Sequence, residues 1–252
     1  MAERAGEGAG ATVVLVHGAG HGPWAWERVV AALEPRGVPT VLVDRRRPGA
    51  PDRRVIGDLH ENARLVRAAL DATPGPLVLA GHSAGGPIIT EAASGHPRVR
   101  RLVYLCASMP DEEGVDPVPH RDPAYQQALR PQPDGTTIVE PADARAAFYS
   151  DCSEEDAAWA VAQLAPQERP PEARQRPAGV AWREIPALYV VCSRDRTIRP
   201  EAQRENSRQA EAVVEWPVGH SPFLNRPELV ADLLEHLARE VAGTGDGAAA
   251  PE

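Results

Sequence analysis

The sequence predicts one α/β domain with a mostly parallel sheet of about six strands flanked by helices. Short runs rich in valine, leucine and isoleucine recur along the 252 residues, and helix-like segments separate them. The runs are continuously apolar, whereas a half-exposed strand would alternate. Such runs are typical of strands that are covered on both faces, as in a parallel sheet between helices.

The elements follow in order along the chain. We expect six strands at the apolar runs 12–16, 40–43, 76–80, 101–106, 187–192 and 212–216. Apolar residues at three- to four-residue spacing predict amphipathic helices between the strands. They are Leu59, Ala63, Val66 and Leu70 in one helix and Val230, Leu233, Leu234 and Leu237 in the last, which Pro227 opens.

A proline-rich stretch interrupts this alternation. Residues 111–182 show no strong strand signal, and 153–164 predict a helix that Ser153 caps. A stretch of this length is too long for a bare loop in a compact domain. We therefore expect a helical lid inserted into a core of residues 12–110 and 183–241, with a disordered leader at 1–11 and a disordered tail at 242–252.

Charge and composition limit the function classes. The formal net charge of −9 disfavours nucleic acid or an anionic membrane as partner, and no apolar run is long enough to span a bilayer. The first residues lack the apolar stretch of a secretory signal, so we expect a cytoplasmic protein. The arginines at 45–47 are interpreted as a solvated loop, and the three cysteines as reduced packing residues.

The stretch LVLAGHSAGG at 77–86 places Ser83 between glycines where a strand ends and a helix begins. A sharp strand-to-helix turn of this kind, a nucleophile elbow, exposes a serine for attack on a carbonyl and needs small neighbours. The helix that starts at Ser83 would also point its N–H groups at an oxyanion. The pattern predicts Ser83 as a nucleophile.

Such a serine needs a base and an orienting acid, in the order serine, acid, histidine for this fold. His220 lies between the last strand and the last helix, and Asp195 follows the preceding strand. We predict His220 as general base and Asp195 as orienting acid, with Asp111 as the rival acid. The oxyanion would be held by the backbone N–H groups of Ala19 and Ala84.

Other histidines near these positions have simpler interpretations. His17 and His21 lie four apart, a spacing that on a helix would suggest a metal pair. They follow a strand and enclose glycines, so we expect no metal site. His82, beside Ser83, is expected to be structural.

The chain resembles the α/β-hydrolase superfamily, and more narrowly its branch of plant methylesterases, salicylate-binding esterases, hydroxynitrile lyases and bacterial relatives. The stretches that carry the resemblance span nearly the whole chain: VLVHGAGHGPWAW, LAGHSAGG, VYLCASMPD, FYSDCSEEDAAWAVAQL, YVVCSRDRTI and VGHSPFLNRPELV. The resemblance implies an α/β-hydrolase fold with Ser83, Asp195 and His220 as catalytic triad and Ala19 and Ala84 as oxyanion donors.

Two residues differ from those of the hydroxynitrile lyases in this branch, and they distinguish between the possible activities. Its hydroxynitrile lyases carry a threonine after the first-strand histidine and a lysine after the catalytic histidine, whereas this chain has Gly18 and Ser221. Cyanohydrin cleavage is therefore disfavoured. We expect a cofactor-independent serine esterase that acts on a small or medium, largely apolar carboxylic ester, with a methyl ester as one option.

The aromatic and small residues near the predicted triad are candidates for the substrate pocket. Candidate pocket residues are Gly18, His21, Trp24, Trp26, Phe148, Tyr149, Trp159 and Ser221. The expected partner is a small-molecule ester, and a homodimer is one possibility for the oligomeric state. A ligand receptor with negligible turnover, and a thioesterase, lactonase or tailoring enzyme of secondary metabolism, stay open as alternatives.

Overall fold

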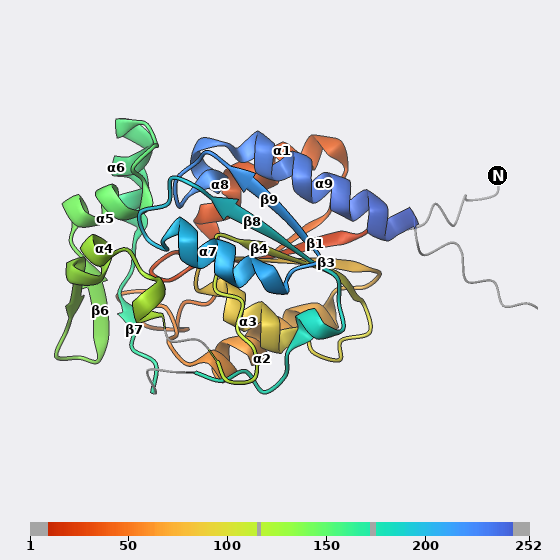
Figure 1. Cartoon of the computed structure of the whole chain (residues 1–252), viewed down its shortest axis with the longest axis horizontal. Helices are drawn as coiled ribbons and strands as arrows, with labels where there is room; N and C mark the ends of the chain where they lie inside the picture. Colours follow the sequence, from red (N-terminus) through yellow and green to blue (C-terminus); the bar gives the residue numbers. More distant parts are fainter. Residues whose placement is uncertain (1–9, 115–116, 172–174, 244–252) are drawn as a thin grey trace, which may run out of the picture.

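A six-stranded parallel sheet with strand order β2-β1-β3-β4-β8-β9 runs through the centre of the chain (Figure 1). The computed structural model describes residues 10–114, 117–171 and 175–243. Each of the six predicted runs forms one strand, so the predicted α/β class is confirmed. The bounds are β1 (Thr12–Val16), β2 (Thr40–Val43), β3 (Leu77–His82), β4 (Val99–Leu105), β8 (Ala187–Cys192) and β9 (Ala212–Trp216).

Helices cover both faces of this sheet. Helices α1 and α9 pack in one apolar cluster with one face of the strands, and α2 and α3 pack in a second cluster with the other face. The described helices are α1 (Glu27–Leu33), α2 (Leu59–Ala72), α3 (Gly85–Ala92), α4 (Pro123–Ala128), α5 (Pro141–Phe148), α6 (Glu154–Gln163), α7 (Pro200–Asn206), α8 (Pro222–Asn225) and α9 (Pro227–Gly243). Short 3₁₀ helices are η1 (Pro23–Trp26), η2 (Glu34–Arg36), η3 (Val118–His120), η4 (Ala181–Arg183) and η5 (Ser207–Gln209).

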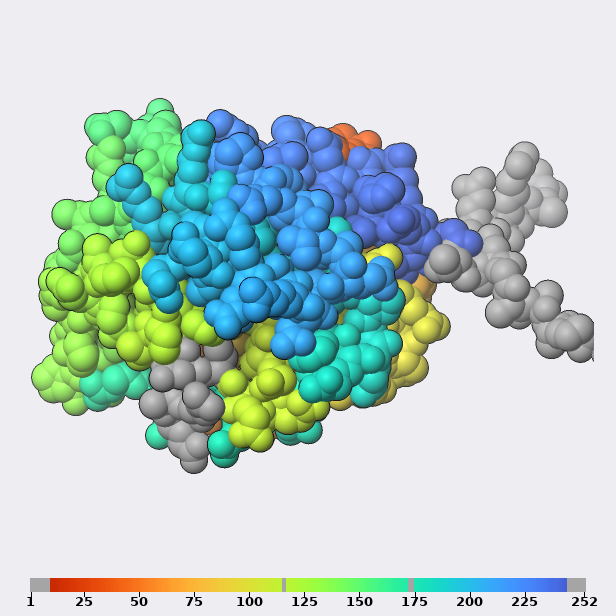
Figure 2. All heavy atoms as spheres, viewed as in Figure 1, coloured from red at the N-terminus to blue at the C-terminus, as the bar shows by residue number. Residues whose placement is uncertain are grey.

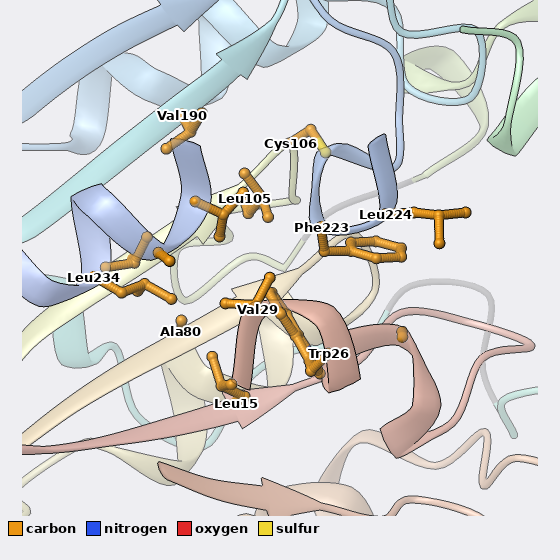
Figure 3. Packing of buried hydrophobic residues seen from close by; sticks show 14 of the residues in the cluster. Leu15, Trp26, Val29, Ala80, Leu105, Cys106, Val190, Phe223, Leu224 and Leu234 are labelled. Atoms are coloured by element: carbon orange, nitrogen blue, oxygen red, sulfur yellow. The ribbon is translucent and has the colours of Figure 1, made fainter. Parts of the chain in front are cut away.

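Side chains of successive strand residues point alternately to the two faces of the sheet and so to the two apolar clusters. Leu15, Ala80 and Val190 face the cluster of α1 and α9, where Trp26 and Phe223 also lie (Figure 3). The adjacent residues Val16, Leu79 and Val191 pack in the other cluster, which explains why the runs show no polar alternation. The edge strand β9 is the exception, because every second residue of it is exposed.

The helix starts agree with their sequence signals. The side chain of Asp58 accepts a hydrogen bond from Glu61 N at 2.7 Å at the start of α2. Ser153 Oγ accepts from Asp156 N at 3.1 Å at the start of α6, as the capping pattern predicts. Pro227 is the first residue of α9, also as predicted.

Residues 111–182 contain helices α4, α5 and α6, which gather at one end of the sheet (Figure 1). In the space-filling view the green part of this segment forms the left end of the visible surface and adjoins the blue α7 region (Figure 2). The segment is not solely helical, which corrects the sequence prediction. It also holds a three-stranded antiparallel sheet of β5 (Leu129–Pro131), β6 (Thr136–Val139) and β7 (Gln167–Glu168). These strands have two to four residues, too few to give a periodic signal.

The predicted leader and tail lie mostly outside the described residues, at 1–9 and 244–252. Their inner bounds need correction. Ala11 is buried at 2% exposure because it packs in the core, and α9 continues to Gly243. Within the described ranges, no helix has both the length and the apolar character that crossing a bilayer requires.

Replacing Gly86 by alanine is expected to destabilise the fold by about 3 kcal/mol or more, since a Cβ there would lie 2.0 Å from the backbone oxygen of Ser108. The clash involves backbone, so a rotamer change cannot relieve it. The matched control is Gly243→Ala, where a Cβ meets open space and stability should hardly change. Urea unfolding of both variants measures the difference, and equal unfolding free energies would contradict the packing described here.

Candidate active site

Ser83 lies in a strained turn between β3 and α3. Its φ of +53° falls in the left-handed region that side chains rarely adopt, which costs on the order of 1 kcal/mol or more. The flanking glycines are required by close backbone contacts. A Cβ on Gly81 would lie 2.8 Å from the carbonyl oxygen of Gly85, and one on Gly85 would lie 2.9 Å from that of Val16. The turn is the one that the glycine pattern predicts, although α3 begins at Gly85 and not at Ser83.

Two hydrogen bonds connect Ser83 through an imidazole to a carboxylate. His220 lies in the loop between β9 and α8, and its Nε2 is 3.1 Å from Ser83 Oγ. The other ring nitrogen, Nδ1, donates to Asp195 Oδ2 at 2.7 Å. All three side chains are at least nine-tenths buried. The structure therefore brings together the three residues that the sequence predicts as a triad.

The carboxylate of Asp195 is held from several sides. Its Oδ1 accepts from the backbone N–H groups of Thr197 at 2.6 Å and Ile198 at 3.0 Å. Its Oδ2 accepts from Gln203 Nε2 at 2.8 Å, and Gln203 Oε1 in turn accepts from Cys192 N at 2.9 Å. These bonds fix the face that the carboxylate presents to the imidazole. Gln203 is not predicted from the sequence, where its only signal is a polar residue on the buried face of α7.

The rival acid, Asp111, has a local structural role. Its Oδ1 accepts a hydrogen bond from Glu113 N at 2.9 Å in the turn after β4. Asp195, and not Asp111, contacts His220.

His82 supports the loop that carries His220. Its Nε2 donates to the backbone oxygen of His220 at 2.9 Å, and Cys106 Sγ lies 3.4 Å from the same oxygen. Ligand atoms of these three residues lie within 4.8 Å of one another, close enough for a metal ion. Burial raises the pKa of the Cys106 thiol well above its usual range, and both His220 nitrogens are already hydrogen-bonded. We therefore interpret the group as support for the loop, and not as a metal centre.

The predicted oxyanion donors come from two places: Ala19 lies in the loop after β1, and Ala84 directly follows Ser83 in the turn after β3. Ala19 and Ala84 line the same cavity as Ser83. His21 holds this loop, because its Nδ1 donates to Ala19 O at 2.7 Å and its Nε2 accepts from the Tyr149 hydroxyl at 2.9 Å. Burial lowers the pKa of His21 to about 4, so the ring is neutral at pH 7.

Most of the predicted pocket residues pack against one another instead of lining a cavity. His21 stacks on Trp24 at a ring distance of 5.2 Å, and Trp159 meets Trp24 edge-on at 5.4 Å. Phe148 alone of the predicted set lines either of the two described cavities near Ser83. The prediction is wrong for the seven residues that line neither cavity. Six of them lie in the core or behind the loops, which are Gly18, His21, Trp24, Trp26, Tyr149 and Ser221, whereas Trp159 is 37% exposed on the surface.

Two adjoining cavities lie beside the serine. The first, here called the serine cavity, has a volume of about 210 Å³ and is lined by Ser83, Ala84 and Arg45 among others. The second, the lid cavity, has a volume of about 600 Å³. Ala19 and Tyr125 line both cavities, so the two adjoin. The apolar walls of the lid cavity are Leu129, Ile138, Val139, Phe148, Val161 and Leu164.

The arginine run does not form a solvated loop, which corrects the sequence prediction. Arg45 is only 2% exposed. Its Nη1 donates to the backbone oxygens of His17 at 2.6 Å and Gly18 at 3.2 Å, and its Nε donates to Asn62 Oδ1 at 2.9 Å. His17 Nε2 accepts from Arg45 N at 3.1 Å, so His17 and His21 have separate partners and form no metal pair.

The fold and site agree with one superfamily, and the sequence pattern of the alpha/beta hydrolase family matches residues 13–233. The chain therefore belongs to the alpha/beta hydrolase family. It is 27% identical over 246 residues to alpha/beta hydrolase nvfD of Aspergillus novofumigatus, which covers 90% of this chain and 96% of the relative. It is 26% identical over 250 residues to pFDCC methylesterase MES16 of Arabidopsis thaliana, which covers 91% of this chain and 94% of the relative.

Solved structures give the same result. A pyrethroid hydrolase from Sphingobium faniae JZ-2 superposes with a TM-score of 0.78 at 26% identity, covering 92% of this chain and 99% of that one. The α/β-hydrolase fold, and the resemblance to the methylesterase branch that the motifs indicate, are thus confirmed.

Acid should destabilise the protein in part through His21. Because its folded pKa of about 4 lies below the ordinary value of 6.5, unfolding takes up a proton between these values, and stability falls as the pH falls through this window. Between about pH 7.5 and pH 5, the unfolding free energy of the wild type should fall because His21 takes up a proton on unfolding. In His21→Gln this fall should be smaller by on the order of 2 kcal/mol. Urea unfolding at the two pH values measures this loss.

The control for this prediction is His236→Gln. The side chain of His236 is 69% exposed, so its replacement should leave the pH dependence of the wild type in place. If His21→Gln loses as much stability on acidification as the wild type, the buried neutral His21 is not the cause.

Proposed function

We propose that the protein is a serine hydrolase that cleaves carboxylic esters through an acyl-enzyme, with Ser83 as nucleophile, His220 as general base and Asp195 as orienting acid. The observation that carries this proposal is the chain of hydrogen bonds from Ser83 Oγ through His220 to Asp195, at 3.1 and 2.7 Å. A serine hydroxyl becomes a good nucleophile when a held imidazole accepts its proton. The carboxylate keeps Nδ1 protonated, so that Nε2 is the acceptor.

The reaction has two halves. Ser83 Oγ attacks the ester carbonyl carbon while its proton passes to His220 Nε2, and the resulting oxyanion accepts from the N–H groups of Ala19 and Ala84. His220 then gives the proton to the alkoxy oxygen as its bond to the carbonyl carbon breaks, and the alcohol leaves. Water attacks the acyl-enzyme, His220 takes its proton and returns it to Ser83, and the acid is released.

The two cavities offer room for the two sides of an ester. The serine cavity of about 210 Å³ suits a small group, and the lid cavity of about 600 Å³ with its aliphatic walls suits a larger apolar group. Similarity to a methylesterase supports ester hydrolysis. Room for only a small group beside the serine agrees with a methyl ester as one option.

Cyanohydrin cleavage fits less well. A Cβ on Gly18 would lie 2.9 Å from His82 Nδ1, so this loop has no room for a threonine there. Ser221 is fully buried and lines neither described cavity. Both positions that carry cyanide chemistry in the lyases thus hold residues that do not reach a substrate.

The first test is Ser83→Ala with p-nitrophenyl and methyl esters of varied acyl length. Hydrolysis should fall by about 10⁴-fold or more, because the nucleophile is removed. The wild type should also react with a fluorophosphonate probe at Ser83, and the variant should not. Labelling without turnover of any ester, thioester or lactone would favour a receptor, and unreduced hydrolysis in Ser83→Ala would overturn the proposal.

The second test separates the two candidate acids. Asp195→Asn should lower kcat by on the order of 10³- to 10⁴-fold, since the amide favours the wrong imidazole tautomer. The matched control, Asp111→Asn, changes only a turn after β4 and should keep kcat within about twofold. A larger loss in Asp111→Asn than in Asp195→Asn would show that the acid is misassigned.

A further inference from the structure

Arg45 brings a buried cation to the serine cavity without a counter-ion. Its side chain forms no ion pair with a carboxylate of the described residues, in contrast to Arg46 and Arg47, which pair with Asp44 and Glu168. Burial lowers the pKa of Arg45 to about 9, so the guanidinium is still charged at pH 7. Keeping an unpaired charge in the interior is costly, and neutral acceptors offset that cost only in part.

The hydrogen bonds of Arg45 leave one nitrogen available. Nε binds Asn62, and Nη1 binds two backbone oxygens, whereas Nη2 has no acceptor among the described residues. Nη2 is also absent from the fully buried polar atoms without a partner, so part of its surface is accessible. Arg45 lines the serine cavity, so a ligand in that cavity is the available acceptor for the two N–H groups of Nη2.

Gly18 is a neighbour of both Arg45 and the reacting serine. Arg45 Nη1 is 3.2 Å from Gly18 O, and a Cβ added to Gly18 would lie 3.1 Å from Ser83 Cβ. Arg45 and Ser83 therefore flank the same loop and line the same cavity. The other charged residues that line the serine cavity do not provide a counter-ion for Arg45. Arg121 is a second cation, and Glu168 is paired with Arg47.

We propose that Arg45 binds a carboxylate of the substrate, so that the enzyme prefers esters that carry an anionic group a few carbons from the scissile ester. This inference rests on the proposed function and differs from the substrate that the sequence predicts, since a largely apolar ester would leave the guanidinium unpaired. We assign a carboxylate and not a phosphate, because the single negative charge of a carboxylate balances the single charge of the guanidinium.

The experiment compares pairs of methyl esters of equal size that differ in charge. Each pair is the monomethyl ester of succinate, glutarate or adipate and the same ester with its free carboxylate replaced by a primary amide. At the best chain length, the wild type should show a kcat/KM about 10- to 100-fold higher for the carboxylate, as expected of a hydrogen bond to a charged group. A ratio of one or less at all three lengths overturns the inference.

Variants separate binding from support of the loop. In Arg45→Met the carboxylate-to-amide ratio should fall to about one, whereas a purely supporting arginine would lower kcat/KM for both esters by the same factor and leave the ratio unchanged. Arg46→Met is the matched control, because Arg46 pairs with Asp44 and lines neither described cavity. Its ratio should equal that of the wild type.

A binding measurement tests the inference without turnover, and it does not require that Arg45→Met folds. Calorimetric titration of Ser83→Ala, which keeps Arg45, should show tighter binding of the carboxylate ester than of its amide. Equal binding overturns the inference even if the wild type hydrolyses neither ester. Failure of the proposed function has a different signature, which is absence of hydrolysis and of fluorophosphonate labelling in the wild type.

Discussion

The hydrogen bond between His220 Nε2 and Ser83 Oγ is the interaction on which the account of this protein depends. It joins loops that follow β3 and β9, which are separated in the sheet by β4 and β8. Parallel pairing places the carboxyl ends of all four strands at one edge. A second hydrogen bond holds the loop of His220 beside Ser83, because His82, next to Ser83, donates to the backbone oxygen of His220. The sheet therefore sets the distance between nucleophile and base before any substrate binds.

The site concentrates features that weaken a fold. Ser83 has a left-handed backbone, His21 is kept neutral by burial, and Arg45 is buried without a carboxylate partner among the described residues. Each costs free energy, and the large apolar clusters on both sheet faces offset these costs. Features of this kind gather where chemistry or binding needs them. The buried positive charge of Arg45 is a feature of this kind that neither core packing nor the catalytic triad explains.

Sequence patterns predicted the sheet well, since apolar strand runs, helix periodicity and caps are local signals. They also pointed to Ser83, Asp195 and His220, because the order of strand ends along the chain is visible in the sequence. They failed for β5, β6 and β7, which are too short to show a period. They failed again for the pocket walls and for Arg45, since which side of a loop faces a cavity depends on tertiary packing.

The most direct test of the central claim is rapid-quench mass spectrometry of the wild type with excess p-nitrophenyl acetate, followed by peptide mapping. If Ser83 is the nucleophile, an acetyl group appears on the peptide that contains Ser83 at the earliest times and is lost when the ester is exhausted. An acetyl group on a different residue, or hydrolysis with the Ser83 peptide unmodified throughout, would contradict it.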